Sequence, residues 1–177
     1  MDSSTEIISK EDFDAKEILR LMRERRSIRN FKDKDIEKDK LMMILEAARW
    51  SQSANNAQPW RLIVIRDKNT LQKLSEIACY GGFIKQAPCS IAIVGLKDVS
   101  PKWYLEDTTI LSHQVCLMAW SLGIGTCWIG SMDRVKAGQI LNLKPTEYLT
   151  TVLPIGYPKN KDQTSQRKPL REIVSQF

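Results

Sequence analysis

Five consecutive residues, Arg25-Arg26-Ser27-Ile28-Arg29, place three guanidiniums and a hydroxyl in one short segment that follows an amphipathic stretch. In an extended segment alternate side chains share a face, so we expect Arg25, Ser27 and Arg29 to converge on one target. Guanidiniums suit anions with several oxygens, because each offers forked donors and stays charged. The segment therefore predicts a phosphate site, with a solvated basic patch as the alternative.

Two further segments are suited to lining a planar cofactor. Residues 53–58 are small and amide residues, which permit close approach and can meet ring carbonyls and nitrogens. Residues 123–130 are apolar and contain three glycines, which suits the presentation of backbone N–H groups. A plain polar turn and a buried connection are the alternatives. A phosphate site beside such loops favours a cofactor that carries the reactivity itself, and a flavin fits because its ring carries hydride chemistry.

Several familiar kinds of active site are absent from the sequence. It has no G-x-G-x-x-G after a strand, no Walker loop and no G-x-S-x-G. The four cysteines form no C-x-x-C pair and the chain has one histidine, so we expect no metal site and reduced, structural cysteines. His113 lies among apolar residues and is expected in the core or an interface. Asp107 is expected to cap a helix.

The hydrophobic pattern predicts an α+β domain with a small central sheet. Helices are expected over residues 12–24, from a cap at 35–37 to about 50, and over 70–79, 107–122 and 133–143; strands are expected over 62–65, 90–96 and 151–155. The helix over 107–122 is apolar nearly all round, which indicates burial by a partner subunit as much as by a single core. We expect one domain over residues 1–177, with a flexible lead (1–11) and a C-terminal arm (158–177).

The charge distribution raises the question of nucleic acid. The formal net charge is +6, and basic residues crowd the stretch from Arg20 to Lys40. A nucleic-acid module also needs a groove-entering helix or exposed aromatics, and neither is evident. No apolar run approaches the roughly 20 residues that span a bilayer, and the polar N-terminus lacks a signal-peptide pattern. We therefore expect a cytoplasmic protein that binds neither nucleic acid nor membranes.

Four motifs in register resemble those of the nitroreductase family of FMN flavoproteins. The motifs are R-R-S-I-R-N-F (25–31), S-A-N-N-A-Q-P-W (53–60), G-I-G-T-C-W-I-G (123–130), and G-Y-P (156–158) followed by R-K-P-L (167–170). The resemblance in their order and spacing extends across about residues 14–174. The resemblance implies an intertwined homodimer of the nitroreductase-like FMN fold, with a central mixed sheet flanked by helices.

The resemblance also implies roles for individual residues. Arg25, Arg26, Ser27 and Arg29 would bind the FMN phosphate and ribityl chain, and Arg167 would close over the phosphate. Ser53, Ala54 and Asn56 would contact the flavin from the second subunit, and Ile129 and Gly130 would supply backbone contacts.

An FMN-dependent oxidoreductase is the function that the resemblance implies. NAD(P)H would supply hydride, an electron-poor small molecule such as a nitroaromatic or quinone would accept electrons, and kinetics would be ping-pong. No side chain is assigned a catalytic role. Two departures from the family pattern stand out. Ser165 occupies a position where many relatives have a second basic residue, which leaves the phosphate to the N-terminal arginines. The segment from Cys79 to Lys102 is short, which leaves the acceptor open. The alternative is a flavin-binding protein for storage or sensing.

Overall fold

A computed structural model describes residues 14–160 and 165–175 of the chain. The predicted lead over residues 1–11 lies outside these ranges. The elements in chain order are α1 (Ala15–Glu24), α2 (Lys38–Arg49), the 3-10 turn η2 (Ala54–Asn56), β1 (Trp60–Ile65), α3 (Lys68–Ile77), η3 (Ile84–Gln86), β2 (Cys89–Leu96), α4 (Tyr104–Ser121), β3 (Gly125–Thr126), α5 (Arg134–Ile140), β4 (Glu147–Gly156) and η4 (Leu170–Glu172).

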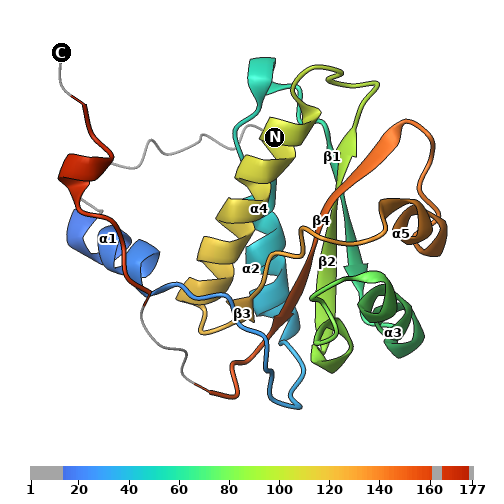
Figure 1. The fold of residues 1–177 in the computed structure, drawn as a ribbon, viewed down its shortest axis with the longest axis horizontal. Coiled ribbons are helices and arrows are strands. Elements are labelled where there is room, and N and C mark those ends of the chain that lie inside the picture. The colour runs from blue at the N-terminus through green and yellow to red at the C-terminus, as the bar shows by residue number, and fades with distance from the viewer. Residues whose placement is uncertain (1–13, 161–164, 176–177) are drawn as a thin grey trace, which may run out of the picture.

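The centre of the fold is a four-stranded sheet in the order β1-β2-β4-β3. All its strand pairs are antiparallel, and a bulge interrupts the β2–β4 register between Ile93 and Val94. The parallel component of the expected mixed sheet is limited to an isolated bridge between Ser27 and Thr126. Helices α2 and α4 cover one face of the sheet, while α3 and α5 lie on the other side (Figure 1).

Burial on both faces explains the composition of the central strands. On β2, Ile91 and Ile93 join the core under α2 and α4, whereas Ala92 and Val94 join the core under α3 and α5. Because both faces are covered, the strand is apolar along its length instead of alternating with polar residues. This is why the sequence predicts the central strands well. The α+β expectation is confirmed.

Local capping signals predict some helix starts and fail at others. Asp133 caps α5 at the start of the helix expected over residues 133–143, with its carboxylate accepting the N–H groups of Val135 and Lys136. By contrast, α4 begins at Tyr104, so the prediction that Asp107 caps it is wrong. The side chain of Glu37, at the start of α2, makes no capping hydrogen bond. Both carboxylates are used instead in contacts between distant parts of the chain.

Glu37 belongs to a small network that fixes the segment after the arginines to the end of β4. The hydroxyl of Tyr157 donates to Glu37, Lys34 pairs with the same carboxylate at 2.9 Å, and Lys40 donates to the Tyr157 hydroxyl at 2.7 Å. The tyrosine and lysine donors lower the pKa of Glu37 to about 2. The ionised carboxylate therefore stabilises the folded state.

This network predicts a pH-dependent contribution to stability. Because the folded pKa of Glu37 lies below its usual value, the contribution is present above about pH 4.5 and is lost as the pH falls toward 2. Replacing Glu37 with glutamine should therefore lower the unfolding free energy at pH 7 and have less effect at pH 3. Urea unfolding of both proteins at the two pH values measures this. If E37Q lowers the unfolding free energy equally at pH 7 and pH 3, the prediction is contradicted.

Candidate functional site

A pocket of about 420 Å³ lies between residues 25–29, called here the arginine segment, and α4. Its walls are Arg25 and Ser27 from the arginine segment, Thr109, His113 and Cys116 from α4, and Thr126 and Trp128 from the glycine-containing segment. Two of the four motifs identified in the sequence thus meet here. One wall carries a guanidinium and hydroxyls, and Trp128 adds an aromatic surface.

Packing between Ile28 and Gly125 positions one wall of this pocket. Ile28 is buried and its N–H donates to the carbonyl of Thr126 at 2.8 Å, beside the bridge from Ser27 to Thr126. A Cβ on Gly125 would lie 2.4 Å from Cγ1 of Ile28, so a larger residue there must displace that side chain or the backbone. The isoleucine of the motif is therefore an anchor that holds Ser27 against Thr126.

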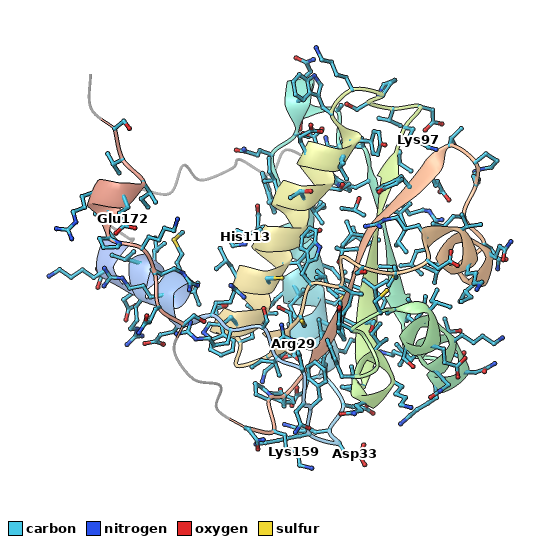
Figure 2. The ribbon with its side chains drawn as sticks, viewed as in Figure 1. Arg29, Asp33, Lys97, His113, Lys159 and Glu172 are labelled. Atoms are coloured by element: carbon cyan, nitrogen blue, oxygen red, sulfur yellow. The ribbon has the colours of Figure 1, made fainter. Side chains whose placement is uncertain are left out.

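The other arginines of the segment lie differently. Arg26 donates to the carbonyls of Arg23 and Arg25, where it satisfies carbonyls at the end of α1. Arg29 reaches the carbonyl of Ser27 at 3.4 Å and lies below the end of α4 (Figure 2). Neither lines the pocket, although Arg29 bonds to a residue that does.

The wall that α4 contributes was missed from the sequence. Thr109, His113 and Cys116 follow each other at spacings of four and three, which places them on one stripe of a helix. His113 is exposed and projects from α4 on the side away from the sheet (Figure 2), so the core alternative is wrong for it. Burial raises the pKa of the Cys116 thiol, which keeps that group protonated. The spacing of these three residues can be read from the sequence. The apolar residues around them, however, indicate a helix buried on most faces, so the sequence does not single out the stripe as part of a site.

All four cysteines are free, and Cys89, Cys116 and Cys127 are buried. Burial raises the pKa of Cys89 to about 11. These three buried thiols therefore behave as the structural cysteines that the sequence predicts, whereas Cys79 is exposed.

The loop over residues 53–58 has an unusual backbone. Asn55, Asn56 and Gln58 all have φ near +50°, a left-handed conformation that asparagine tolerates better than most residues. The Ser53 hydroxyl accepts the Gln58 N–H at 2.9 Å and closes the loop. The N–H of Ala54 donates to Asp107 at 3.0 Å, which attaches the loop to the first turns of α4.

The loop and the pocket lie on different sides of α4. At about 100° per residue, Thr109, His113 and Cys116 lie roughly 180–240° around the helix axis from Asp107. The loop attached to Asp107 is at one end of α4, and the arginine segment lies toward the other end (Figure 1). The structure of one chain therefore does not bring Ser53, Ala54 and Asn56 to the pocket that contains Arg25.

The remaining predicted site residues are dispersed. Ile129 is buried, and its carbonyl accepts from the Thr151 hydroxyl, while the carbonyl of Gly130 accepts from Arg134. Both directly follow Trp128 of the pocket. Arg167 is exposed and donates to the carbonyl of Gln166, in the part of the C-terminal arm that lies on the same side of the molecule as α1 (Figure 1).

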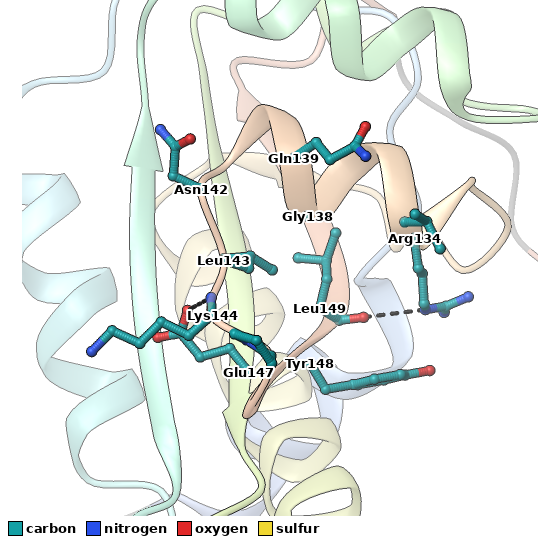
Figure 3. A pocket seen from close by; sticks show the side chains of 11 residues that line it. Arg134, Gly138, Gln139, Asn142, Leu143, Lys144, Glu147, Tyr148 and Leu149 are labelled. Carbon is teal, nitrogen blue, oxygen red and sulfur yellow. Dashed lines mark hydrogen bonds between the residues drawn. The ribbon is translucent and has the colours of Figure 1, made fainter.

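A second pocket, of about 530 Å³, lies against α5 and the start of β4 (Figure 3). Its arginine, Arg134, donates to the carbonyls of Leu149 and Gly130, and Glu147 accepts from the Lys144 N–H and pairs with Arg61. These polar groups already have protein partners, so the pocket offers no obvious ligand chemistry. In the described part of the chain no three His, Cys, Asp or Glu side chains are grouped as metal ligands. None of the described helices has the length and hydropathy needed to cross a membrane.

Comparisons with known proteins agree on one family. A model described as the nitroreductase family matches residues 22–80 and 76–157. A provisionally named NADH dehydrogenase/NAD(P)H nitroreductase from Methanothermobacter thermautotrophicus is 34% identical over 156 residues, which cover 84% of this chain and 81% of that protein. The structure of an FMN-dependent nitroreductase from Clostridium difficile is 30% identical, with a TM-score of 0.77 over 82% of this chain and 90% of its own. A nitroreductase family protein from the same species is 32% identical, with a TM-score of 0.79 over 88% and 95%.

Proposed function

The chain belongs to the nitroreductase family, and from this we propose that it is an FMN-dependent NAD(P)H oxidoreductase that reduces an electron-poor small molecule by a ping-pong mechanism. The names of its relatives support FMN as cofactor and NAD(P)H as donor. The acceptor belongs to the class of nitroaromatics, quinones and similar compounds. One pocket that serves donor and acceptor in turn produces ping-pong kinetics.

The pocket between the arginine segment and α4 is the observation that carries this proposal. Its residues fit FMN, because Arg25 and the Ser27 hydroxyl suit a phosphate, and Trp128 offers an aromatic surface for a ring. When bound, FMN supplies the hydride chemistry. The protein's residues hold the phosphate, orient the ring and exclude water, and Cys116 stays a neutral part of the wall. We assign no general acid or base.

We propose that the working site is shared between the two subunits of a homodimer. The loop over residues 53–58 lies away from the pocket of its own chain, so its Ser53, Ala54 and Asn56 can serve the pocket of a partner. A groove of about 570 Å³ lined by Met42, Met43, Glu46, Ala47, Trp50 and Met118 crosses α2 and α4. Its exposed apolar side chains are the kind of surface that subunits bury.

The apolar residues of α1 and the C-terminal arm support the same assembly. Ile18, Leu19 and Met22 are exposed on α1, and Leu170 and Ile173 are exposed on the arm. We propose that both segments pack on the partner, which would bring Arg167 toward a phosphate. We also propose one domain over residues 1–177 and a cytoplasmic location, where a reducing environment suits free thiols.

Reduction of the bound flavin tests the proposed activity. The purified protein should be yellow, and anaerobic addition of NADH or NADPH should bleach its absorbance near the flavin maximum. Adding a quinone or a nitroaromatic compound should then restore the colour. Dithionite is the control, because it shows that the bound flavin can be reduced. A flavin that dithionite bleaches but neither nicotinamide nor reduced ferredoxin does would contradict the enzyme and favour a storage or sensing protein.

A further inference from the structure

Asp107 is a buried carboxylate with an unusual set of partners. Its residue is 4% exposed, and one carboxylate oxygen accepts the N–H of Ala54. Its other oxygen, Oδ2, is buried and has no hydrogen-bond partner in the described part of the chain. Burying a carboxylate with a single donor is costly, and such groups are rare in folded proteins. A hydrophobic side chain at this position would avoid this cost, so we look for a role that depends on the carboxylate.

The segment that Asp107 holds is the loop of the proposed flavin site. Among the hydrogen bonds of the described residues, the bond from Ala54 is the one that joins residues 53–58 to a distant element. The other bonds of this loop are local, such as those from Gln58 and Asn56 to Ser53. Three left-handed residues make the conformation costly, so it needs an external restraint.

We propose that Asp107 is a positioning residue of the flavin site: it fixes Ala54, and through it Ser53 and Asn56, in the conformation that contacts the flavin of the partner subunit. This inference rests on the proposed function. The neighbouring Glu106 is exposed and makes no such bond, so a general preference for acidic residues near a helix start does not account for the contact. The position of Asp107 on α4 links the loop to the helix that also forms a wall of the pocket.

Two substitutions of Asp107 separate hydrogen bonding from charge and shape. In Asp107→Asn the side-chain oxygen can still accept the Ala54 N–H, whereas Asp107→Leu keeps a branched side chain and removes the acceptor. We expect the FMN dissociation constant to rise about tenfold in D107L and to stay within about twofold in D107N. A positioning role predicts that D107N binds FMN nearly as well as the natural protein. If the site required the negative charge of Asp107, D107N would bind FMN as weakly as D107L.

Ala54→Pro removes the same hydrogen bond from its other side. Ser53 has φ −149° and ψ 157°, the extended conformation that precedes proline, and Ala54 is the first residue of η2, where proline is tolerated. A54P should weaken FMN binding about as much as D107L does. Combined with D107L it should add little, because both changes remove one interaction. Additive losses in the double variant would overturn the proposal.

Hydrogen exchange in the flavin-free protein provides a readout independent of the cofactor. Amides of residues 53–58 should exchange faster in D107L and A54P than in the natural protein, and D107N should resemble the natural protein. The control is Asp133→Leu, which removes a carboxylate that accepts backbone N–H groups at α5. D133L should lower the melting temperature without changing FMN affinity or exchange in the loop.

The two measurements keep this inference distinct from the proposed function. A natural protein that binds no FMN would overturn the function, and the role of Asp107 at a flavin site with it, whatever the loop does. FMN binding that is equal in D107L, D107N and the natural protein would overturn the role of Asp107 alone. Unchanged hydrogen exchange of residues 53–58 in D107L would also overturn the role of Asp107. If D107L fails to fold, the FMN affinity and the hydrogen exchange of A54P test the role instead.

Discussion

Replacing Arg25 and Arg29 together with alanine is expected to leave the protein without FMN at micromolar concentrations. Arg25 lines the pocket and Arg29 bonds to the backbone of Ser27 beside it. Removing one partner of a desolvated, hydrogen-bonded charge pair costs about 2–5 kcal/mol, and tenfold in affinity corresponds to about 1.4 kcal/mol. The dissociation constant of FMN should therefore rise by about thirtyfold to several thousandfold. Titration of the apoprotein, followed by quenching of FMN fluorescence, measures it.

Arg20→Ala is the matched control for this double variant. Arg20 lies on α1, is exposed and pairs with Glu17 at 3.5 Å, so its loss lowers the positive charge of the same region without touching the pocket. A surface ion pair of this kind contributes little to stability. We expect its FMN affinity to stay within about threefold of the natural protein at physiological salt. Full flavin retention by the double variant would remove the phosphate role from the arginine segment.

Replacing Met43 with glutamate is expected to convert the protein into a flavin-free monomer. Met43 is exposed on α2 and lines the apolar groove with Trp50 and Met118. A carboxylate buried there would lack a partner, and twofold symmetry introduces the penalty twice in each dimer. Because the loop over residues 53–58 then has no neighbouring pocket to serve, FMN binding should fall together with association. Sedimentation velocity gives the oligomeric state, and absorbance of the same sample gives the flavin content.

Val135→Glu tests whether an added surface charge by itself causes loss of the dimer and of the flavin. Val135 is 74% exposed on α5, on the opposite side of the sheet from α2. This variant should remain dimeric and yellow. A dimeric M43E, or a monomeric M43E that keeps its flavin, would contradict a site shared across this surface.

Much of the fold follows from local patterns in the sequence. Continuous apolar runs predict β2 and β4, and Asp133 predicts the start of α5, because each depends on residues close in the chain. The motif that contains Ile28 is likewise recognised from neighbouring residues, whereas the packing of Ile28 against the distant Gly125 is not.

Pairings between distant residues could not be predicted in this way. The strand β3 has two residues, Gly125 and Thr126, and it exists because β4 and Ser27 lie beside it. Asp107 resembles a helix cap in the sequence, but its partner Ala54 is 53 residues away. His113 lies in an apolar stretch, and only the placement of the arginine segment shows that it faces a pocket.

The separation of loop and pocket around α4 has a consequence for inheritance. If each subunit lends its loop to the other, damage to the loop impairs the neighbour's site, and damage at Arg25 impairs the subunit's own. Consider a dimer of one subunit with an altered loop and one subunit with an altered Arg25. Both alterations then belong to one of the two sites, and the second site has an unaltered loop and an unaltered Arg25. Two defective alleles expressed in one cell would then complement each other, whereas two alleles altered in the same segment would not.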